Sequence, residues 1–212
     1  MSLTDPTEDL ALLTEMRGGN ATAFEALFRR HQAPLYRFAL LRCGSPDTAA
    51  DIVQEIFMNL LSDALKFDPA RGALQGFLFG VARNLALKRD VAQQRYVARK
   101  HHDNEDGADI EDTIIDPAPP PAQRLLDQEQ AETVRRALQQ LAPHYRDVVI
   151  LYEMHDLTYV EIAQICNIDI GTVRSRLSRA RAKLFELLQP DFPETIISDA
   201  RQTQSPQQEA IS

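Results

Sequence analysis

The chain has 212 residues, a net charge of −8 and a hydrophobic content of 44%, which suits one or two globular domains with buried cores. Its two cysteines, Cys43 and Cys166, lack the CxxC spacing of a zinc site, so we expect free thiols in a reducing compartment. The acidic N-terminus does not read as a signal peptide, and no apolar run approaches the ~20 residues that cross a bilayer. These features argue against a disulfide-rich secreted protein and against membrane insertion, and we expect a cytoplasmic protein.

Helical segments separated by strong breakers are predicted along residues 1–100. Asn20 can cap the second of these helices, and Ser45 followed by Pro46 is typical of the start of the third. A turn-rich loop, KFDPARG, precedes the fourth helix. The expected helices span residues 9–17, 20–42, 47–64 and 73–100. We therefore predict that residues 1–100 form one all-α domain.

A change of composition follows this domain. Residues 101–122, HHDNEDGADIEDTIIDPAPPPA, are acidic and rich in proline, which predicts a flexible, extended linker. The adjacent pair His101-His102 with Asp103 lacks further metal ligands, so we expect no metal and no other cofactor. Further helices are expected over residues 123–141 and 143–156. A second small helical domain is thus predicted over residues 123–189, with a disordered tail over 190–212.

The segment Thr158–Lys183, TYVEIAQICNIDIGTVRSRLSRARAK, predicts a helix-turn-helix. Thr158 and Glu161 have the spacing of a capping box, and Asp169 can cap the second helix. That second helix carries five cationic side chains and no anionic one, which suits entry into a DNA major groove. The expected inward stripe consists of Val173, Leu177, Ala180 and Leu184. The alternative is an ordinary amphipathic helix with a solvated basic face.

The overall charge qualifies this DNA-binding prediction. Phosphate binding is mainly electrostatic, and a chain with a net charge of −8 should bind DNA poorly by itself. We therefore expect a protein that reads DNA as part of a larger assembly.

Three motifs in a fixed order carry a resemblance to a known family. They are DTAADIVQEIFMNLL, GFLFGVARNLALKRD and IGTVRSRLSRARAKL. Together they resemble the RNA polymerase sigma factors of the extracytoplasmic-function group, over roughly residues 20–188. The resemblance implies a non-enzymatic subunit that binds core RNA polymerase, directs it to promoter DNA and helps to open the duplex. It also implies an anti-sigma protein as a further partner, and no small-molecule substrate.

The resemblance also implies three sets of site residues. The core polymerase would bind Asp51, Gln54, Glu55 and Met58, which share one helix side; a merely solvated helix face is the alternative. The downstream promoter element, as single-stranded DNA, would contact Phe67, Arg71, Leu74, Gln75, Arg83, Asn84, Lys88 and Arg89. The upstream element would contact Thr172, Arg174, Ser175, Arg176, Ser178, Arg179 and Arg181. The family usually has tryptophan where Phe77 stands, whereas this chain contains no tryptophan.

A stand-alone regulator and an enzyme are the two alternatives to a sigma factor. A stand-alone helix-turn-helix transcriptional regulator would bind its operator tightly without polymerase, which the acidic net charge disfavours. An enzyme is not expected, because the sequence has no Gly-rich phosphate loop, no HExxH motif and no spacing typical of a nucleophile with its base.

Overall fold

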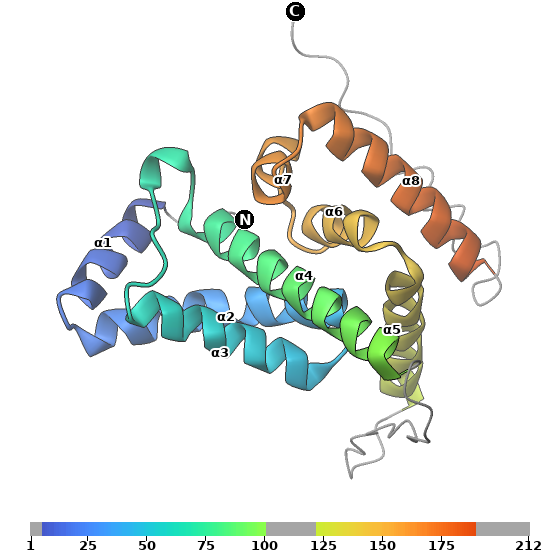
Figure 1. Cartoon of the computed structure of the whole chain (residues 1–212), viewed down its shortest axis with the longest axis horizontal. Coiled ribbons are helices and arrows are strands. Elements are labelled where there is room, and N and C mark those ends of the chain that lie inside the picture. The colour runs from blue at the N-terminus through green and yellow to red at the C-terminus, as the bar shows by residue number, and fades with distance from the viewer. Residues whose placement is uncertain (1–5, 101–121, 190–212) are drawn as a thin grey trace, which may run out of the picture.

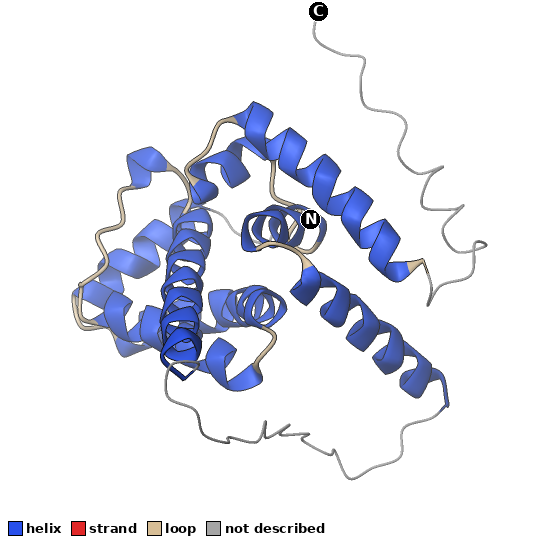
Figure 2. Ribbon diagram, turned by 45° about the vertical axis from the view of Figure 1, so that its right-hand side comes forward, coloured by secondary structure: helices blue, strands red, loops and turns tan. Residues whose placement is uncertain are grey.

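A computed structural model describes residues 6–100 and 122–189 of the chain. Within these two ranges the regular structure is helical, in agreement with the predicted all-α class (Figures 1 and 2). The helices are α1 (Pro6–Arg17), α2 (Ala21–Cys43), α3 (Pro46–Leu61), α4 (Leu74–Lys100), α5 (Ala122–Gln140), α6 (Pro143–Glu153), α7 (Tyr159–Cys166) and α8 (Ile170–Leu188), with a 3₁₀ turn at Pro69–Arg71. Most of the predicted linker, including His101, His102 and Asp103, and the predicted tail lie outside the described residues.

The predicted helix starts are confirmed by their capping hydrogen bonds. The Asn20 side chain accepts from the backbone N–H groups of Thr22 and Ala23 at 3.0 and 3.4 Å. Ser45 Oγ accepts from the N–H of the third residue of α3 at 3.3 Å, with Pro46 in the first turn. These caps satisfy N–H groups that have no partner inside the helix, which explains why the two helices begin at these points.

Some helix ends differ from the predicted ones for local reasons. α1 begins at Pro6 instead of residue 9, because proline is favoured in the first turn of a helix. α3 ends at Leu61 and α6 at Glu153, each a few residues before its predicted end. In both cases an aspartate soon after the helix, Asp63 or Asp156, adopts a left-handed backbone with φ of 53°, which cannot continue a right-handed helix.

A cluster of charged side chains holds α1 against α2. Arg30 Nη1 of α2 donates to Asp9 Oδ1 at 2.7 Å, and His31 Nε2 lies 3.1 Å from Asp9 Oδ2. Burial raises the pKa of the Asp9 carboxyl, but His31 and Arg30 outweigh burial and the net shift is downward. The carboxylate therefore stays ionised and holds α1 on α2.

The second half of the chain, residues 122–189, packs α8 across α6 and α5 (Figure 1). The predicted inward stripe of α8 is confirmed, since Val173, Leu177 and Ala180 are buried and Leu184 is half-buried. α7 lies against α6, α8 and also α4 of the first half, residues 6–100.

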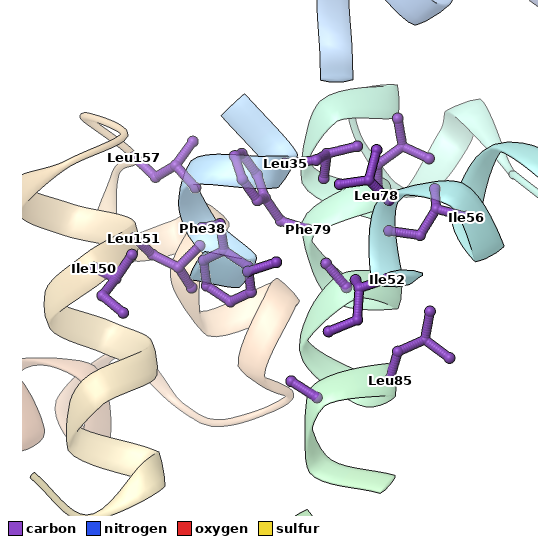
Figure 3. Close-up of a cluster of buried hydrophobic side chains, with 14 of the residues drawn as sticks. Leu35, Phe38, Ile52, Ile56, Leu78, Phe79, Leu85, Ile150, Leu151 and Leu157 are labelled. Carbon is purple, nitrogen blue, oxygen red and sulfur yellow. The ribbon is translucent and has the colours of Figure 1, made fainter. Parts of the chain in front are cut away.

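Buried side chains from both halves meet in one hydrophobic core (Figure 3). Phe38 of α2 and Phe79 of α4 have their ring centroids 5.6 Å apart in an edge-on arrangement. Ile150 and Leu151 of α6, with Leu157 beyond it, approach them from the second half. In the described conformation the two predicted domains are thus packed against each other. None of the helices in the described ranges is both long and apolar enough to cross a membrane.

Candidate nucleic-acid interface

The four residues predicted to bind core polymerase share the solvent side of α3 and are here called the α3 face. Asp51 and Gln54 are exposed, and Met58 is 59% exposed although it is apolar. Glu55 is half-buried and lies 3.2 Å from Nη2 of Arg89 on α4. The opposite side of the helix supplies six buried residues to the core. The α3 face therefore combines acidic groups with an uncovered apolar side chain, which suits a protein partner better than a purely solvated surface.

The loop between α3 and α4 borders a cleft of about 750 Å³, here called the strand cleft. Phe67 and Phe77 line it with ring centroids 5.5 Å apart, and both are half-buried. Arg71 is exposed at its edge. Gly72, with φ of 131°, gives the loop a backbone conformation that residues with a Cβ rarely adopt. Stacking surfaces and a cation thus lie side by side, as capture of an unpaired base requires.

One of the predicted strand-contacting residues, Leu74, is placed differently by the structure. Leu74 is only 1% exposed, because the first turn of α4 directs it into the core, so it does not line the strand cleft. Phe79 is fully buried and Phe77 is not, which separates the core aromatic from the one available at the cleft. Gln75 is half-buried.

Only some of the polar side chains on α4 that we predicted to contact DNA are exposed to solvent. Asn84 and Lys88 are exposed. Arg83, which lines the strand cleft, donates through Nε to Asp147 Oδ2 of α6 at 2.8 Å. The carboxylate of Asp147, in the second half, therefore already pairs with Arg83, which we predicted to contact DNA.

The helix-turn-helix is built as predicted. Thr158 and Glu161 form a reciprocal capping box at the start of α7. Asn167 ends α7 with a left-handed backbone, and Asp169 accepts from the N–H of Thr172 at 2.8 Å at the start of α8. Hydrogen bonds from Thr172 hold the pKa of the Asp169 carboxyl below its usual value. Thr172 is thus hydrogen-bonded to the capping residue Asp169, and this bond fixes the direction in which α8 leaves the turn.

Exposed polar and cationic groups gather on α8 and are here called the reading face. Its members are Arg174, Ser175, Ser178 and Arg179. The Arg174 guanidinium lies 5.8 Å from the ring centroid of Tyr159 on α7, a cation–π contact that restricts its rotamers before any ligand binds. Arg176 is half-buried, about 200° round the helix from Arg174. The predicted set therefore does not act as one surface.

Arg181 departs most clearly from its predicted DNA contact. Its Nε and Nη2 lie 2.7 and 2.6 Å from Glu153 Oε1 at the end of α6, and its guanidinium is 5.1 Å from the Tyr152 ring centroid. These contacts raise the pKa of Arg181, although burial acts in the opposite direction. Arg181 braces α8 on α6, and it would have to release Glu153 before it could reach DNA.

A buried ionic cluster between the two halves is not predicted from the sequence. Arg42 of α2 donates through Nε to Asp147 Oδ1 and through Nη2 to Asp90 Oδ2, each at 2.6 Å. Burial alone would lower the pKa of Arg42, but these carboxylates outweigh it. Arg146 beside it donates to the carbonyl oxygen of Arg42 at 2.8 Å. The signal in the sequence is weak, because these residues lie in different helices and share no periodic pattern.

Together these features define a DNA-binding protein of the helix-turn-helix class, with an exposed face on α3 that combines acidic and apolar side chains. Comparison with known families makes the class specific. The family model described as Sigma-70 region 2 matches residues 27–96, and the model described as Sigma-70, region 4 matches residues 131–184.

Individual relatives agree with the family models. The ECF RNA polymerase sigma factor SigM of Mycobacterium tuberculosis is 31% identical over 182 residues, which cover 85% of this chain and 84% of SigM. SigE of Mycolicibacterium smegmatis is 30% identical over 173 residues, or 82% of this chain and 64% of SigE. This chain therefore belongs to the extracytoplasmic-function group of RNA polymerase sigma factors. It directs RNA polymerase to promoters and is not itself an enzyme.

Solved structures show the same fold. RpoE from Bartonella quintana, in complex with the anti-sigma factor NepR, is similar with a TM-score of 0.57 and 30% identity, covering 80% of this chain and 98% of that one. CnrH, in complex with the cytosolic domain of CnrY, is similar with a TM-score of 0.61 and 25% identity, covering 87% and 99% respectively.

Proposed function

We propose that this sigma factor divides a promoter between its two halves. The α3 face binds core RNA polymerase in the cytoplasm, the strand cleft with α4 captures the unpaired downstream element, and the reading face of α8 contacts the upstream element. The observation that carries this assignment is the exposed cationic side of α8, held outward by caps at both helices of the helix-turn-helix.

The upstream contact is argued from the order imposed on Arg174. Its cation–π contact with Tyr159 positions a guanidinium near the start of α8, the part of a recognition helix that meets base edges. Arg179 lies more than one turn further along and is exposed, which suits a phosphate contact. The two arginines therefore have different roles in this proposal.

Replacing Arg174 by alanine is expected to weaken promoter binding of the assembled holoenzyme by about 1–3 kcal/mol and to relax sequence preference at one position. The reason is that a guanidinium reading guanine is lost together with its fork of donors. Selection from a randomised promoter library measures both effects. Arg135→Ala, on α5 and paired with Glu132, is the matched control. An unchanged preference in the Arg174 variant would mean that this arginine holds only the backbone.

Reversing one charge on the α3 face tests the polymerase contact. Asp51→Arg is expected to weaken binding to core polymerase about tenfold or more. The acidic α3 face suits a positively charged partner surface, and like charges brought together across an interface cost several kcal/mol. Fluorescence titration of the labelled chain with core polymerase measures this affinity. The control is Glu129→Arg, the same charge change at an exposed residue of α5. Equal losses in both variants would remove the α3 face from the proposal.

Run-off transcription with purified core polymerase tests the whole assignment. Promoter-specific transcripts are expected only when this chain is added. If no transcripts form, while the chain alone binds a defined duplex tightly, it would instead act as a stand-alone regulator.

We also propose an anti-sigma protein as a partner of this chain. The support is the similarity to RpoE, which was solved in complex with the anti-sigma factor NepR, and the uncovered apolar residues Met58 and Leu61 on α3, which are 59% and 52% exposed. An anti-sigma protein that covers them would compete with core polymerase for the same helix.

A further inference from the structure

The turn that opens the α3–α4 loop contains an aspartate at a position where glycine is usual. The N–H of Ala64 donates to Asn59 O at 2.9 Å and that of Asp63 donates to Leu60 O at 3.3 Å, which is the Schellman pattern that ends many helices. Asp63 occupies the left-handed position of this pattern, with φ of 53°. Glycine adopts that backbone without the steric cost that a Cβ brings. The turn alone therefore does not account for the carboxyl group of Asp63.

The carboxylate of Asp63 joins the loop to α1. Arg17, the last residue of α1, places Nη2 2.8 Å from Asp63 Oδ1, and Lys66 places Nζ 2.6 Å from Asp63 Oδ2. The hydrogen bond from Lys66 has the largest influence on the pKa of Asp63 and lowers it, and Arg17 acts in the same direction. Because α1 is itself held on α2 through Asp9, Arg17 anchors the start of the loop to a packed helix.

The anchored segment leads directly into the strand cleft. Lys66 and the next residue, Phe67, both line this cleft, as does Arg71. Asp68 caps the 3₁₀ turn that ends at Arg71. On the other side, the ring of Phe67 lies 5.5 Å from that of Phe77 on α4, measured between centroids. The position of Phe67 therefore depends on the ion pairs before it in the loop and on the aromatic contact with α4.

We propose that Asp63 and Arg17 are positioning residues for capture of the unpaired downstream element. Their ion pair, here called the brace, holds the α3–α4 loop in its binding conformation, and neither residue contacts DNA. The inference rests on the proposed function of the strand cleft. Exposed ion pairs contribute little to the stability of a whole chain, and these two side chains are 37% and 47% exposed. The effect of the brace therefore falls on the loop, which without it loses more conformational entropy when DNA binds.

The variant Asp63→Asn tests the brace and keeps the turn, because asparagine has nearly the same shape and tolerates the left-handed backbone. Holoenzyme that carries it is expected to bind a promoter fragment premelted over the downstream element about three- to tenfold more weakly. The fragment carries a promoter selected from the randomised library, and fluorescence anisotropy measures its affinity. Core polymerase affinity and the urea midpoint of the free chain should stay unchanged, whereas hydrogen exchange in residues 62–72 should become faster.

Asp156→Asn is the matched control, because Asp156 is also exposed and has the same left-handed φ of 53°. It should bind the premelted fragment as the wild type does. Arg17→Ala removes the ion pair from the side of α1, should weaken binding as well, and serves if Asp63→Asn does not fold. Arg17→Lys retains the cation and should restore most of the affinity. Because the two residues act through one contact, Arg17→Ala combined with Asp63→Asn should bind no more weakly than Asp63→Asn alone.

The outcomes separate this inference from the proposed function. Weaker binding by both single variants, without additivity and with the control unchanged, supports the brace. If wild-type holoenzyme forms promoter-specific transcripts, while either single variant binds the premelted fragment like Asp156→Asn or their losses add, the brace is overturned and the sigma-factor assignment stands. A parallel loss of core polymerase affinity or of folding stability would also overturn it. Absence of promoter-specific transcripts with the wild type would contradict the proposed function, and the inference with it.

Discussion

Replacing Arg146 by methionine is expected to lower the free energy of unfolding by about 3–5 kcal/mol, because several buried carbonyl groups lose a charged side-chain donor. Arg146 is 8% exposed. Its Nη1 donates to Arg42 O at 2.8 Å and to Gln139 Oε1 at 2.6 Å, while Nη2 donates to Leu141 O at 2.9 Å and to Gln139 O. The guanidinium thus satisfies the C-terminal carbonyls of α5 and the end of α2 together.

Urea denaturation followed by circular dichroism measures this loss. Arg135→Met is the matched control, because Arg135 lies on α5, is more exposed and pairs with Glu132; its expected change is within about 0.5 kcal/mol. Burial lowers the pKa of Arg146, as does its neighbour Arg42, so methionine also relieves a buried charge. A loss below about 1 kcal/mol would mean that removal of the buried charge, or water that enters the site, offsets the missing hydrogen bonds.

Acidification is expected to destabilise the fold through His155. Burial, followed by the positive charge of Arg37 on α2, lowers the pKa of His155 to about 4, while Asp156 acts in the opposite direction and α4 contributes the neutral ring of Phe79. The group is therefore neutral when folded and takes up a proton more readily when unfolded, where its pKa is 6.5. Its contribution to stability is complete above pH 6.5 and is lost progressively as the pH falls toward about 4.

Between about pH 7.5 and pH 5 this single group should remove about 2 kcal/mol of unfolding free energy. Urea denaturation of the wild type and of His155→Leu at both pH values measures it. Leucine keeps an apolar side chain against Phe38 and Phe79 but does not titrate, so its pH dependence should be shallower by about that amount. Identical pH dependences for the two proteins would show that His155 is as accessible to protons in the folded chain as in the unfolded one.

The local features of the fold were predictable because each is encoded within a few residues. Asn20, Ser45 and Asp169 cap the helices they were predicted to cap, and Thr158 forms the predicted box with Glu161. Such signals depend on side chains three residues or fewer from the backbone groups that they satisfy. The helix-turn-helix follows from them. The family resemblance, which the comparisons confirm, rests instead on three motifs in a fixed order.

The ion-pair partners of individual arginines in the folded chain could not be predicted in the same way. Arg83 and Arg181 belong to basic stretches that we assigned to DNA, yet Arg83 pairs with Asp147 and Arg181 with Glu153. Helical periodicity indicates which side of a helix faces inward, but not which carboxylate from another helix will meet an arginine there. Arg42 is the clearest case, since a fully buried arginine looks like any surface cation in the sequence.

The separation in sequence between the partners of the buried ionic cluster has a consequence for biosynthesis. Arg42 leaves the ribosome 105 residues before Asp147, a delay of roughly 5–20 s at ordinary rates of translation. During that interval the nascent first half must fold with Arg42 matched only by Asp90, or keep the end of α2 hydrated. The side of α4 that α7 contacts also remains exposed until α7 has been synthesised.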